Sequence, residues 1–152
     1  MEDVSLLVIK PEAFSRRYLV LDSLRDRGYA VLKIKEMKGW PGFIPKIYVE
    51  FTEEQKNAFV DAYLKSEFRT DFIAAIVTHK KGNTIERLKN DVGNFSAYQK
   101  RTNKTLRSEF GLPKEYNIVS QDLTAVFNGL HKINDVKDFY KHLLLFDISW
   151  PA

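Results

Sequence analysis

Short apolar runs of strand length alternate along this chain with segments whose apolar residues recur at helical spacing. A strand needs neighbours in a sheet, and an amphipathic helix must bury its apolar face against that sheet. The alternation therefore restricts the chain to a layered fold of mixed α and β structure. Strands are predicted at residues 5–10, 29–38, 71–78 and 123–127, and helices at 16–27, 53–66, a short segment begun by Asn83 and a last segment begun by Asn134.

The order of these elements is strand, helix, strand, helix, strand, short helix, long loop, strand and helix. This order predicts a ferredoxin-like α/β sandwich, in which helices pack on a four-stranded antiparallel sheet. A doubly wound parallel sheet is the alternative. The chain contains neither a GxGxxG nor a GxxxxGKS/T pattern, so the usual reason to prefer a doubly wound nucleotide-binding fold is missing.

The second predicted strand, residues 29–38, has the clearest alternation of apolar and charged residues. In the second predicted strand, Ala30, Leu32 and Ile34 face one way and Lys33 and Lys35 the other, which predicts a strand with one solvated face.

Three further segments complete the prediction. Residues 40–51 fit no single element. Thr52 and Gln55 have the spacing of a capping box at the start of a helix. Residues 93–122 are polar and poorly periodic, which predicts a long loop with some helical turns.

Composition predicts one globular domain over residues 1–152. The chain has 152 residues, no cysteine and 44% hydrophobic residues, and a chain of this length buries roughly two thirds of its unfolded surface without needing a disulfide or a structural metal. Its apolar runs are far shorter than the roughly 20 residues of a membrane span, and its first residues are acidic rather than basic. We therefore expect a cytoplasmic protein with no membrane partner.

The charge is mildly basic, at +4 from 24 Lys and Arg against 20 Asp and Glu. Such an excess permits an anionic partner but does not require one. Because the basic residues are spread along the chain rather than gathered in a block, nucleic acid is not expected as a partner.

The three histidines differ in their setting. His79 is predicted to be an exposed loop residue and His142 a partly buried structural residue of the last helix. His131 lies between a predicted apolar strand and a predicted helix, where a side chain can project into a cleft while its neighbours hold it still. From position alone a structural role for His131 remains open. With no cysteine, no HxxxH pair and no GxSxG segment, neither a resident metal nor a serine hydrolase is expected.

Three segments resemble one known family. Residues 6–13, LLVIKPEA, resemble the opening strand and the Ile-Lys-Pro-Asp-Ala segment of nucleoside diphosphate kinases. Residues 105–111, TLRSEFG, resemble the family's Thr-Ile-Arg-Gly-Asp-Phe-Gly, and Asn128-x-x-His131 resembles its Asn-x-x-His motif. The segments occur in the family's order and span nearly the whole chain, whose length is close to one family subunit. The chain is identified by this resemblance as a divergent member, and the ferredoxin-like fold is the family's fold.

The resemblance implies a phosphotransferase that moves the γ-phosphate of a nucleoside triphosphate to a nucleoside diphosphate, with Mg²⁺ held on the phosphates. His131 would be the nucleophile that forms a phosphohistidine, for which a neutral imidazole is suited. Lys10 and Arg107 would contact the phosphates, and Asn128 would hold a sugar hydroxyl. The family also implies assembly into a homo-oligomer.

Two further residues follow from the same resemblance. Tyr48 matches a tyrosine that lies near the phosphates and the histidine. Lys89 stands where the family has a phosphate-contacting arginine, a replacement that keeps the charge and loses the bidentate geometry.

The chain also departs from the family pattern. The Gly-Ser-Asp that follows the family's histidine is replaced by Lys132-Ile133-Asn134, and His142 stands where an acidic residue orients the imidazole. The loop between Arg107 and His131 is longer than the family's. A catalytically impaired nucleotide-binding or interaction module on the same fold is therefore the alternative function.

Overall fold

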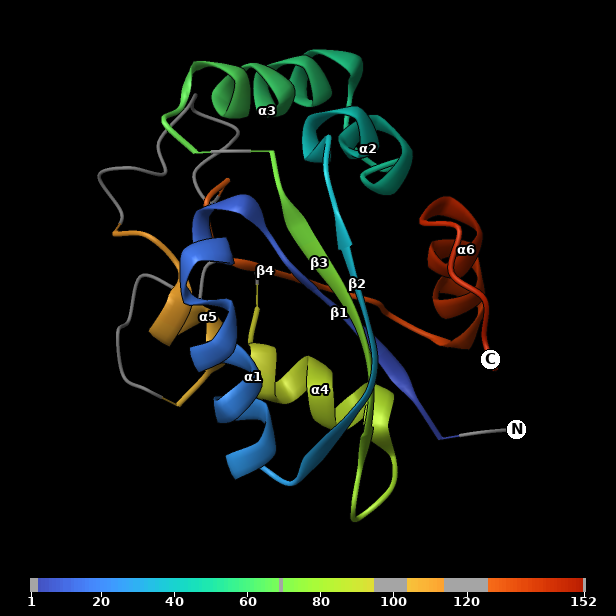
Figure 1. The fold of residues 1–152 in the computed structure, drawn as a ribbon. Coiled ribbons are helices and arrows are strands. Elements are labelled where there is room, and N and C mark those ends of the chain that lie inside the picture. The colour runs from blue at the N-terminus through green and yellow to red at the C-terminus, as the bar shows by residue number, and fades with distance from the viewer. Residues whose placement is uncertain (1–2, 69, 95–103, 114–125, 152) are drawn as a thin grey trace.

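The sheet of this protein has four strands in the order β2-β3-β1-β4, and every neighbouring pair is antiparallel (Figure 1). The predicted four-stranded antiparallel sheet is thus confirmed. The structure is a computed structural model, and it describes residues 3–68, 70–94, 104–113 and 126–151. The strands are β1 (Ser5–Ile9), β2 (Tyr29–Met37), β3 (Phe72–His79) and β4 (Leu130–Lys132).

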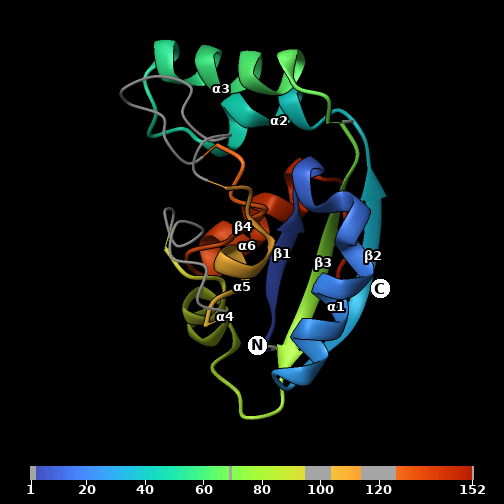
Figure 2. The ribbon, with the colours of Figure 1, turned by 90° about the vertical axis from the view of Figure 1, so that its left-hand side faces the viewer.

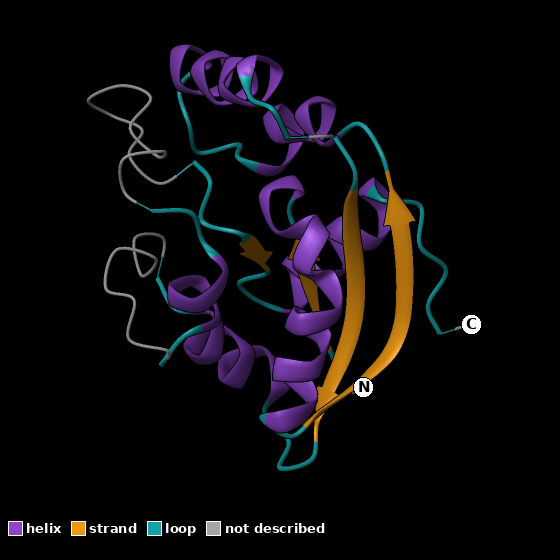
Figure 3. Ribbon diagram, turned by 60° about the vertical axis from the view of Figure 1, so that its left-hand side comes forward, coloured by secondary structure: helices purple, strands orange, loops and turns teal. Residues whose placement is uncertain are grey.

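Helices cover both faces of the sheet and one of its ends. Figure 1 shows α2 and α3 beyond one end of the long strands, with α6 to one side, and Figure 2 shows α1 lying along β2 and β3. Figure 3 separates the long strands β2 and β3 from the surrounding helices by colour. A 3-10 helix at Pro11–Arg16 precedes α1 (Arg17–Asp26), and the other helices are α2 (Trp40–Ile47), α3 (Glu53–Lys65), α4 (Thr84–Val92), α5 (Leu106–Phe110) and α6 (Val136–Leu145).

The core is divided in two by the sheet because side chains alternate across each strand. In β1, Leu7 and Ile9 join a cluster with α1, α4 and α5. Leu6 and Val8 join the larger cluster with α2, α3 and α6. All five residues of β1 are buried, as predicted for a strand covered on both faces.

The last strand lies later in the chain than predicted. Residues 123–125 lie outside the described residues, and Val126 and Phe127 are buried but belong to a turn rather than to the sheet. Phe127 packs instead against the ring of Tyr63, with the ring centroids 5.0 Å apart. The apolar run predicted a strand because it is hydrophobic, but its burial comes from packing under α3. His131 consequently lies inside β4 rather than after a strand.

The solvated face of β2 is the opposite of the one its alternation suggests. Leu32 and Ile34 are each 46% exposed, whereas Lys33 and Lys35 are only partly exposed. The ammonium of Lys35 donates to the carbonyls of Phe146 and Asp147, each at 2.8 Å, and Lys33 donates to the carbonyl of Ser149 at 2.7 Å. The segment after α6 covers the lysine face, because a long lysine stem can be buried while its charged end binds carbonyls.

Local signals at the helix starts agree with the structure in part. The capping box at Thr52 and Gln55 is confirmed, and the ambiguous residues 40–51 contain α2. Asn83 precedes α4 in a left-handed conformation but makes no side-chain cap bond. Helix α6 is capped by Asp135 rather than by Asn134.

His79 is not an exposed loop residue. It ends β3 and is 8% exposed. Its Nε2 lies 2.8 Å from the carbonyl of Arg27, to which it donates, and its Nδ1 accepts from the backbone N–H of Lys81 at 3.0 Å. His79 thus connects the start of β2 with the turn after β3.

Over the described part of the chain, every helix falls short of the length and hydrophobicity that crossing a membrane would require.

Candidate active site

His131 faces the side of the sheet that carries α6. It lies opposite Val8 in the β1–β4 pairing, and residues directly opposite each other in an antiparallel pair share one face. Its imidazole packs near the rings of Tyr48 and Trp40, at centroid distances of 5.4 and 6.4 Å. The residue as a whole is partly exposed, and its ring is held by these neighbours.

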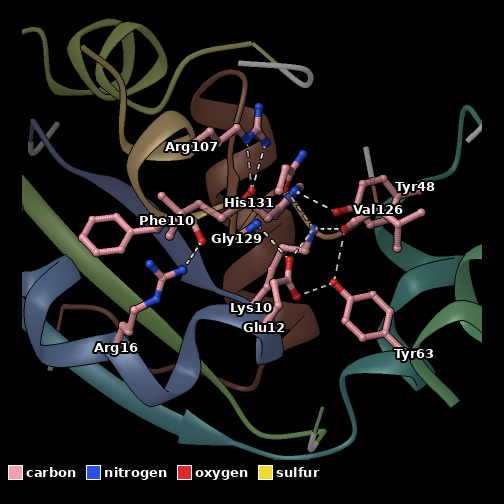
Figure 4. A network of polar contacts seen from close by, with 12 residues as sticks. Lys10, Glu12, Arg16, Tyr48, Tyr63, Arg107, Phe110, Val126, Gly129 and His131 are labelled. Atoms are coloured by element: carbon pink, nitrogen blue, oxygen red, sulfur yellow. Dashed lines mark hydrogen bonds and ion pairs between the residues drawn. The ribbon is translucent and has the colours of Figure 1, made fainter. Parts of the chain in front are cut away.

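Tyr48 places a hydroxyl beside His131. The residue follows α2, and its ring stacks on Phe59 with centroids 4.8 Å apart. Its hydroxyl lies 3.5 Å from Nδ1 of His131, and Figure 4 marks this contact with a dashed line. Burial raises the pKa of Tyr48, so the phenol stays protonated and keeps a hydrogen to donate.

Lys10 is completely buried just beyond the end of β1. Its ammonium donates to the carbonyl of Val126 at 2.7 Å and to Oδ1 of Asn128 at 3.0 Å (Figure 4 shows the first). Burial lowers the pKa of Lys10 to about 8, although the nearby carboxylate of Glu12 acts in the opposite direction. The lysine therefore holds the segment that leads into β4 while keeping most of its charge near neutral pH.

Glu12 is a site residue that the sequence analysis missed. One of its oxygens accepts from the hydroxyl of Tyr63 at 2.7 Å, and the other accepts from the backbone N–H of Gly129 at 2.8 Å. The second oxygen also lies 3.4 Å from the ammonium of Lys10. The only sequence signal was its acidic character directly after Lys10-Pro11, at a place that the family resemblance also fills with an acid.

Arg107 approaches β4 from α5, a short helix that begins with a capping box formed by Thr105 and Ser108. Its Nε and Nη2 donate to the carbonyl of Leu130 at 3.2 and 3.0 Å, and Nη1 donates to the carbonyl of Gly93 at 2.9 Å. Burial lowers the pKa of Arg107 to about 10. The guanidinium is therefore still charged at neutral pH.

These surroundings keep the His131 imidazole neutral. Burial lowers its pKa well below the ordinary value, and His142, Arg107, Lys10 and Lys132 lower it further in that order. A neutral imidazole has a lone pair on one ring nitrogen and can act as a nucleophile or a base.

His142, predicted to be a structural residue of the last helix, touches His131 directly. It is 2% exposed on α6, and its Nε2 lies 2.9 Å from Nε2 of His131.

The predicted site residues are not all brought together. Lys10 and Asn128 contact each other, Tyr48 contacts His131, and Arg107 binds the carbonyl next to His131 in the chain. Lys89 instead lies by Glu86 and the carbonyl of Asn134, at 3.4 and 3.3 Å. The structure thus gathers five of the six predicted residues around β4. It places Lys89 on α4, where its ammonium contacts the segment between β4 and α6.

No three His, Asp or Glu side chains among residues 3–68, 70–94, 104–113 and 126–151 lie together so that they could hold a metal ion. The carboxylate of Glu12, which contacts Lys10, is already engaged by Lys10, Tyr63 and Gly129. Among the described residues, the carboxylates near the predicted site residues therefore form no preformed cluster for a resident cation.

A separate pocket of about 400 Å³ lies where β1 begins, against α6 and the C-terminal segment. Val4, Phe139 and Trp150 are among its lining residues, and none of the predicted site residues lines it. The pocket and the polar cluster at His131 are therefore separate features of the fold.

Known proteins match this chain in structure but not in sequence. No protein-family model matches the chain, and no curated protein sequence matches it. Among solved structures, the nucleoside diphosphate kinase of Aquifex aeolicus superposes with a TM-score of 0.68 at 17% identity, covering 95% of this chain and 94% of that one. The apo nucleoside diphosphate kinase of Encephalitozoon cuniculi superposes with a TM-score of 0.69 at 14% identity, covering 99% and 95%. This chain therefore has the fold of the nucleoside diphosphate kinases.

Proposed function

We propose that this chain is a divergent nucleoside diphosphate kinase that transfers a γ-phosphate through a phosphohistidine at His131. The observation that carries the proposal is the neutral imidazole of His131 next to the Tyr48 hydroxyl and among the cations of Lys10 and Arg107. Phosphoryl transfer needs a positioned nucleophile and positive charge around the transferring group more than it needs covalent chemistry from the protein.

In this proposal each residue has a separate task. His131 attacks the γ-phosphorus, and the bond to the leaving nucleoside diphosphate oxygen breaks. Tyr48 donates a hydrogen bond near the reacting nitrogen. Arg107 and Lys10 supply positive potential, and Asn128 binds a sugar hydroxyl. The second half-reaction reverses these steps with another nucleoside diphosphate.

The direct test is incubation with γ-labelled ATP and Mg²⁺. The native protein should acquire acid-labile, alkali-stable label, and His131→Ala should acquire none. His79→Gln is the matched control and should still be labelled, because His79 ends β3, which β1 separates from β4, and its ring binds the carbonyl of Arg27. An unlabelled native protein, or label that survives His131→Ala, refutes the proposal.

A second candidate is a nucleotide-binding module without turnover. It is favoured by the hydrogen bonds of the two cations. The ammonium of Lys10 and the guanidinium of Arg107 both donate to backbone carbonyls, so these donors are already engaged within the protein. Calorimetric binding of nucleoside triphosphates together with absent exchange between ATP and other nucleoside diphosphates would select this candidate.

We also propose that the chain works as a homo-oligomer in the cytoplasm. Support for assembly comes from four exposed apolar side chains on α1 and β2, two elements that contact each other. They are Tyr18 at 67%, Leu19 at 58%, and Leu32 and Ile34 at 46% exposure. Sedimentation equilibrium of the native chain and of Leu32→Glu should give a larger mass for the native chain, and equal monomer masses would contradict assembly through this face.

A further inference from the structure

The imidazoles of His131 and His142 share one hydrogen bond. Their Nε2 atoms are 2.9 Å apart, and the rings stack with centroids 5.1 Å apart at an angle of 24°. Two imidazole nitrogens can make this contact only when one of them carries a hydrogen and the other offers a lone pair. The direction of the bond therefore decides which nitrogen of His131 can react.

Asp138 sets that direction. The Nδ1 of His142 lies 2.8 Å from the backbone carbonyl of Asp138 and 3.2 Å from its Oδ1. Burial alone would raise the pKa of the Asp138 carboxyl, but hydrogen bonds from His142 and from the backbone N–H of Asn134 outweigh it, and the pKa lies below its ordinary value. The backbone carbonyl oxygen of Asp138 can only accept a hydrogen bond, and so can Oδ1 of its ionised carboxylate. Nδ1 of His142 therefore carries the hydrogen.

The remaining assignments follow from this one. A neutral His142 with its hydrogen on Nδ1 has its lone pair on Nε2, so Nε2 of His131 must be the donor. His131 then has its lone pair on Nδ1, the nitrogen that faces the hydroxyl of Tyr48 at 3.5 Å (Figure 4).

We propose that His142 is a positioning residue which, together with Asp138, holds His131 in the tautomer whose Nδ1 is the reacting nitrogen. The inference rests on the proposed phosphotransfer at His131. In the transfer step, the Nδ1 lone pair forms the N–P bond, and the electron pair of the breaking P–O bond goes to the leaving nucleoside diphosphate. The positive charge that develops on the His131 ring is shared through Nε2–H with His142, whose own Nδ1–H is bound to Asp138. His142 therefore orients His131 as a carboxylate would, and it is itself oriented by the carboxylate and carbonyl of Asp138 in the preceding turn of α6.

A histidine in this position differs from a carboxylate in one respect. A carboxylate accepts at any pH at which it is ionised, whereas His142 accepts at Nε2 only while it is neutral. A second proton on His142 would make Nε2 a donor and would remove the bond that orients His131. In the part of the chain that the structure describes, the cations that act on the pair are Lys10 from the end of β1, Arg107 from α5, Lys132 from β4 and, through Asp138, Lys141 from α6. Asp138 is the anion that contacts His142, and the Tyr48 phenol is neutral.

The first measurement reads the tautomers without requiring activity. Long-range proton–nitrogen correlation spectra of the native chain labelled with ¹⁵N-histidine, assigned with His131→Ala and His79→Gln, should show hydrogen on Nε2 of His131 and on Nδ1 of His142. Hydrogen on Nδ1 of His131 would overturn the inference.

The second measurement uses the labelling reaction across pH. His142→Glu should keep the Nε2–H tautomer of His131 and should extend labelling to lower pH than in the native chain. His142→Phe should leave the tautomers mixed and reduce the labelling rate about 10- to 100-fold, with nucleotide affinity unchanged. Tyr140→Phe, on the exposed side of the same helix, is the matched control and should behave as the native chain.

The outcomes separate this inference from the proposed function. A native chain that takes no label but shows the expected tautomers would refute the proposed function and leave the orientation of His131 by His142 standing. A labelled native chain whose pH profile is unchanged by His142→Glu, or whose rate is unchanged by His142→Phe, would refute the role of His142. If His142→Phe fails to fold, the role of His142 is still tested by the tautomers of the native chain and by the pH profile of His142→Glu.

Discussion

The ammonium of Lys10 and the carboxylate of Glu12 form an ion pair with 3.4 Å between Nζ and Oε2, and neither side chain is exposed to solvent. The two residues lie on either side of Pro11, and both bind the segment that precedes β4. A buried pair of this kind is valuable mainly because losing one partner leaves the other charge buried alone. It therefore ties the position of His131 to the end of β1.

Removing the negative charge should destabilise the fold strongly. For Glu12→Gln we expect the free energy of unfolding to fall by about 3 to 5 kcal/mol, because the ammonium of Lys10 loses its counterion in a buried site. Urea unfolding followed by circular dichroism measures the change. Glu53→Gln is the control, since the Glu53 side chain is 86% exposed and its pair with Lys56 should contribute less than about 1 kcal/mol. Equal effects of the two substitutions would contradict a stabilising pair.

Stability should rise with pH above 8. The pKa of Lys10 is lowered by burial to about 8 from 10.5, so between these values the unfolded chain holds a proton that the folded protein has released. The free energy of unfolding then increases with pH, by at most about 1.4 kcal/mol per pH unit for this one proton. Above pH 10 the slope should reverse, because burial raises the pKa values of Tyr48 and Tyr63 and the unfolded chain ionises first.

Urea unfolding at a series of pH values between 7 and 11 tests this dependence. The double variant with Lys10→Met and Glu12→Gln removes both buried charges and should lose the rise between pH 8 and 10. A native profile that is flat or falling over that interval would show that Lys10 does not release its proton in the folded state.

Gly129 should not tolerate a side chain. Its φ is +89°, and a Cβ atom there would lie 2.8 Å from the carbonyl oxygen of Phe110. We expect Gly129→Ala to lower the free energy of unfolding by about 2 kcal/mol or more, through backbone strain and displacement of β4. Gly42→Ala is the matched control, because no atom lies within 4 Å of a Cβ there and the substitution in α2 favours the helix. Thermal unfolding of the two variants should shift in opposite directions.

Arg107→Lys should test whether the guanidinium fork is needed. Lysine keeps the charge but cannot donate to the carbonyls of Leu130 and Gly93 together, so we expect a loss of about 2 kcal/mol in the free energy of unfolding and slower labelling of His131. Arg25→Lys, whose side chain is 54% exposed, should change neither. An Arg107→Lys variant with native stability would show that the three hydrogen bonds are dispensable.

The sequence predicted the elements whose signals are local. The capping box of α3 at Thr52 and Gln55 lies within four residues, and the apolar run of β1 shows by itself that the strand is covered on both faces. The strand and helix order predicted the antiparallel sandwich, with a doubly wound parallel sheet as the alternative, because few layered arrangements bury these faces. The motifs around Lys10, Arg107 and His131 pointed to residues that the fold brings together.

Tertiary structure decided the features that depend on which distant segments meet. It placed β4 at Leu130–Lys132 because Ile9 pairs with Leu130, and it covered the lysine face of β2 with the chain that follows α6. Glu12 and His142 became site residues only through contacts with segments 117 and 11 residues away in the chain. Periodicity records which side chains prefer burial, but it cannot record which partner a buried polar group will find, since that depends on how the layers pack.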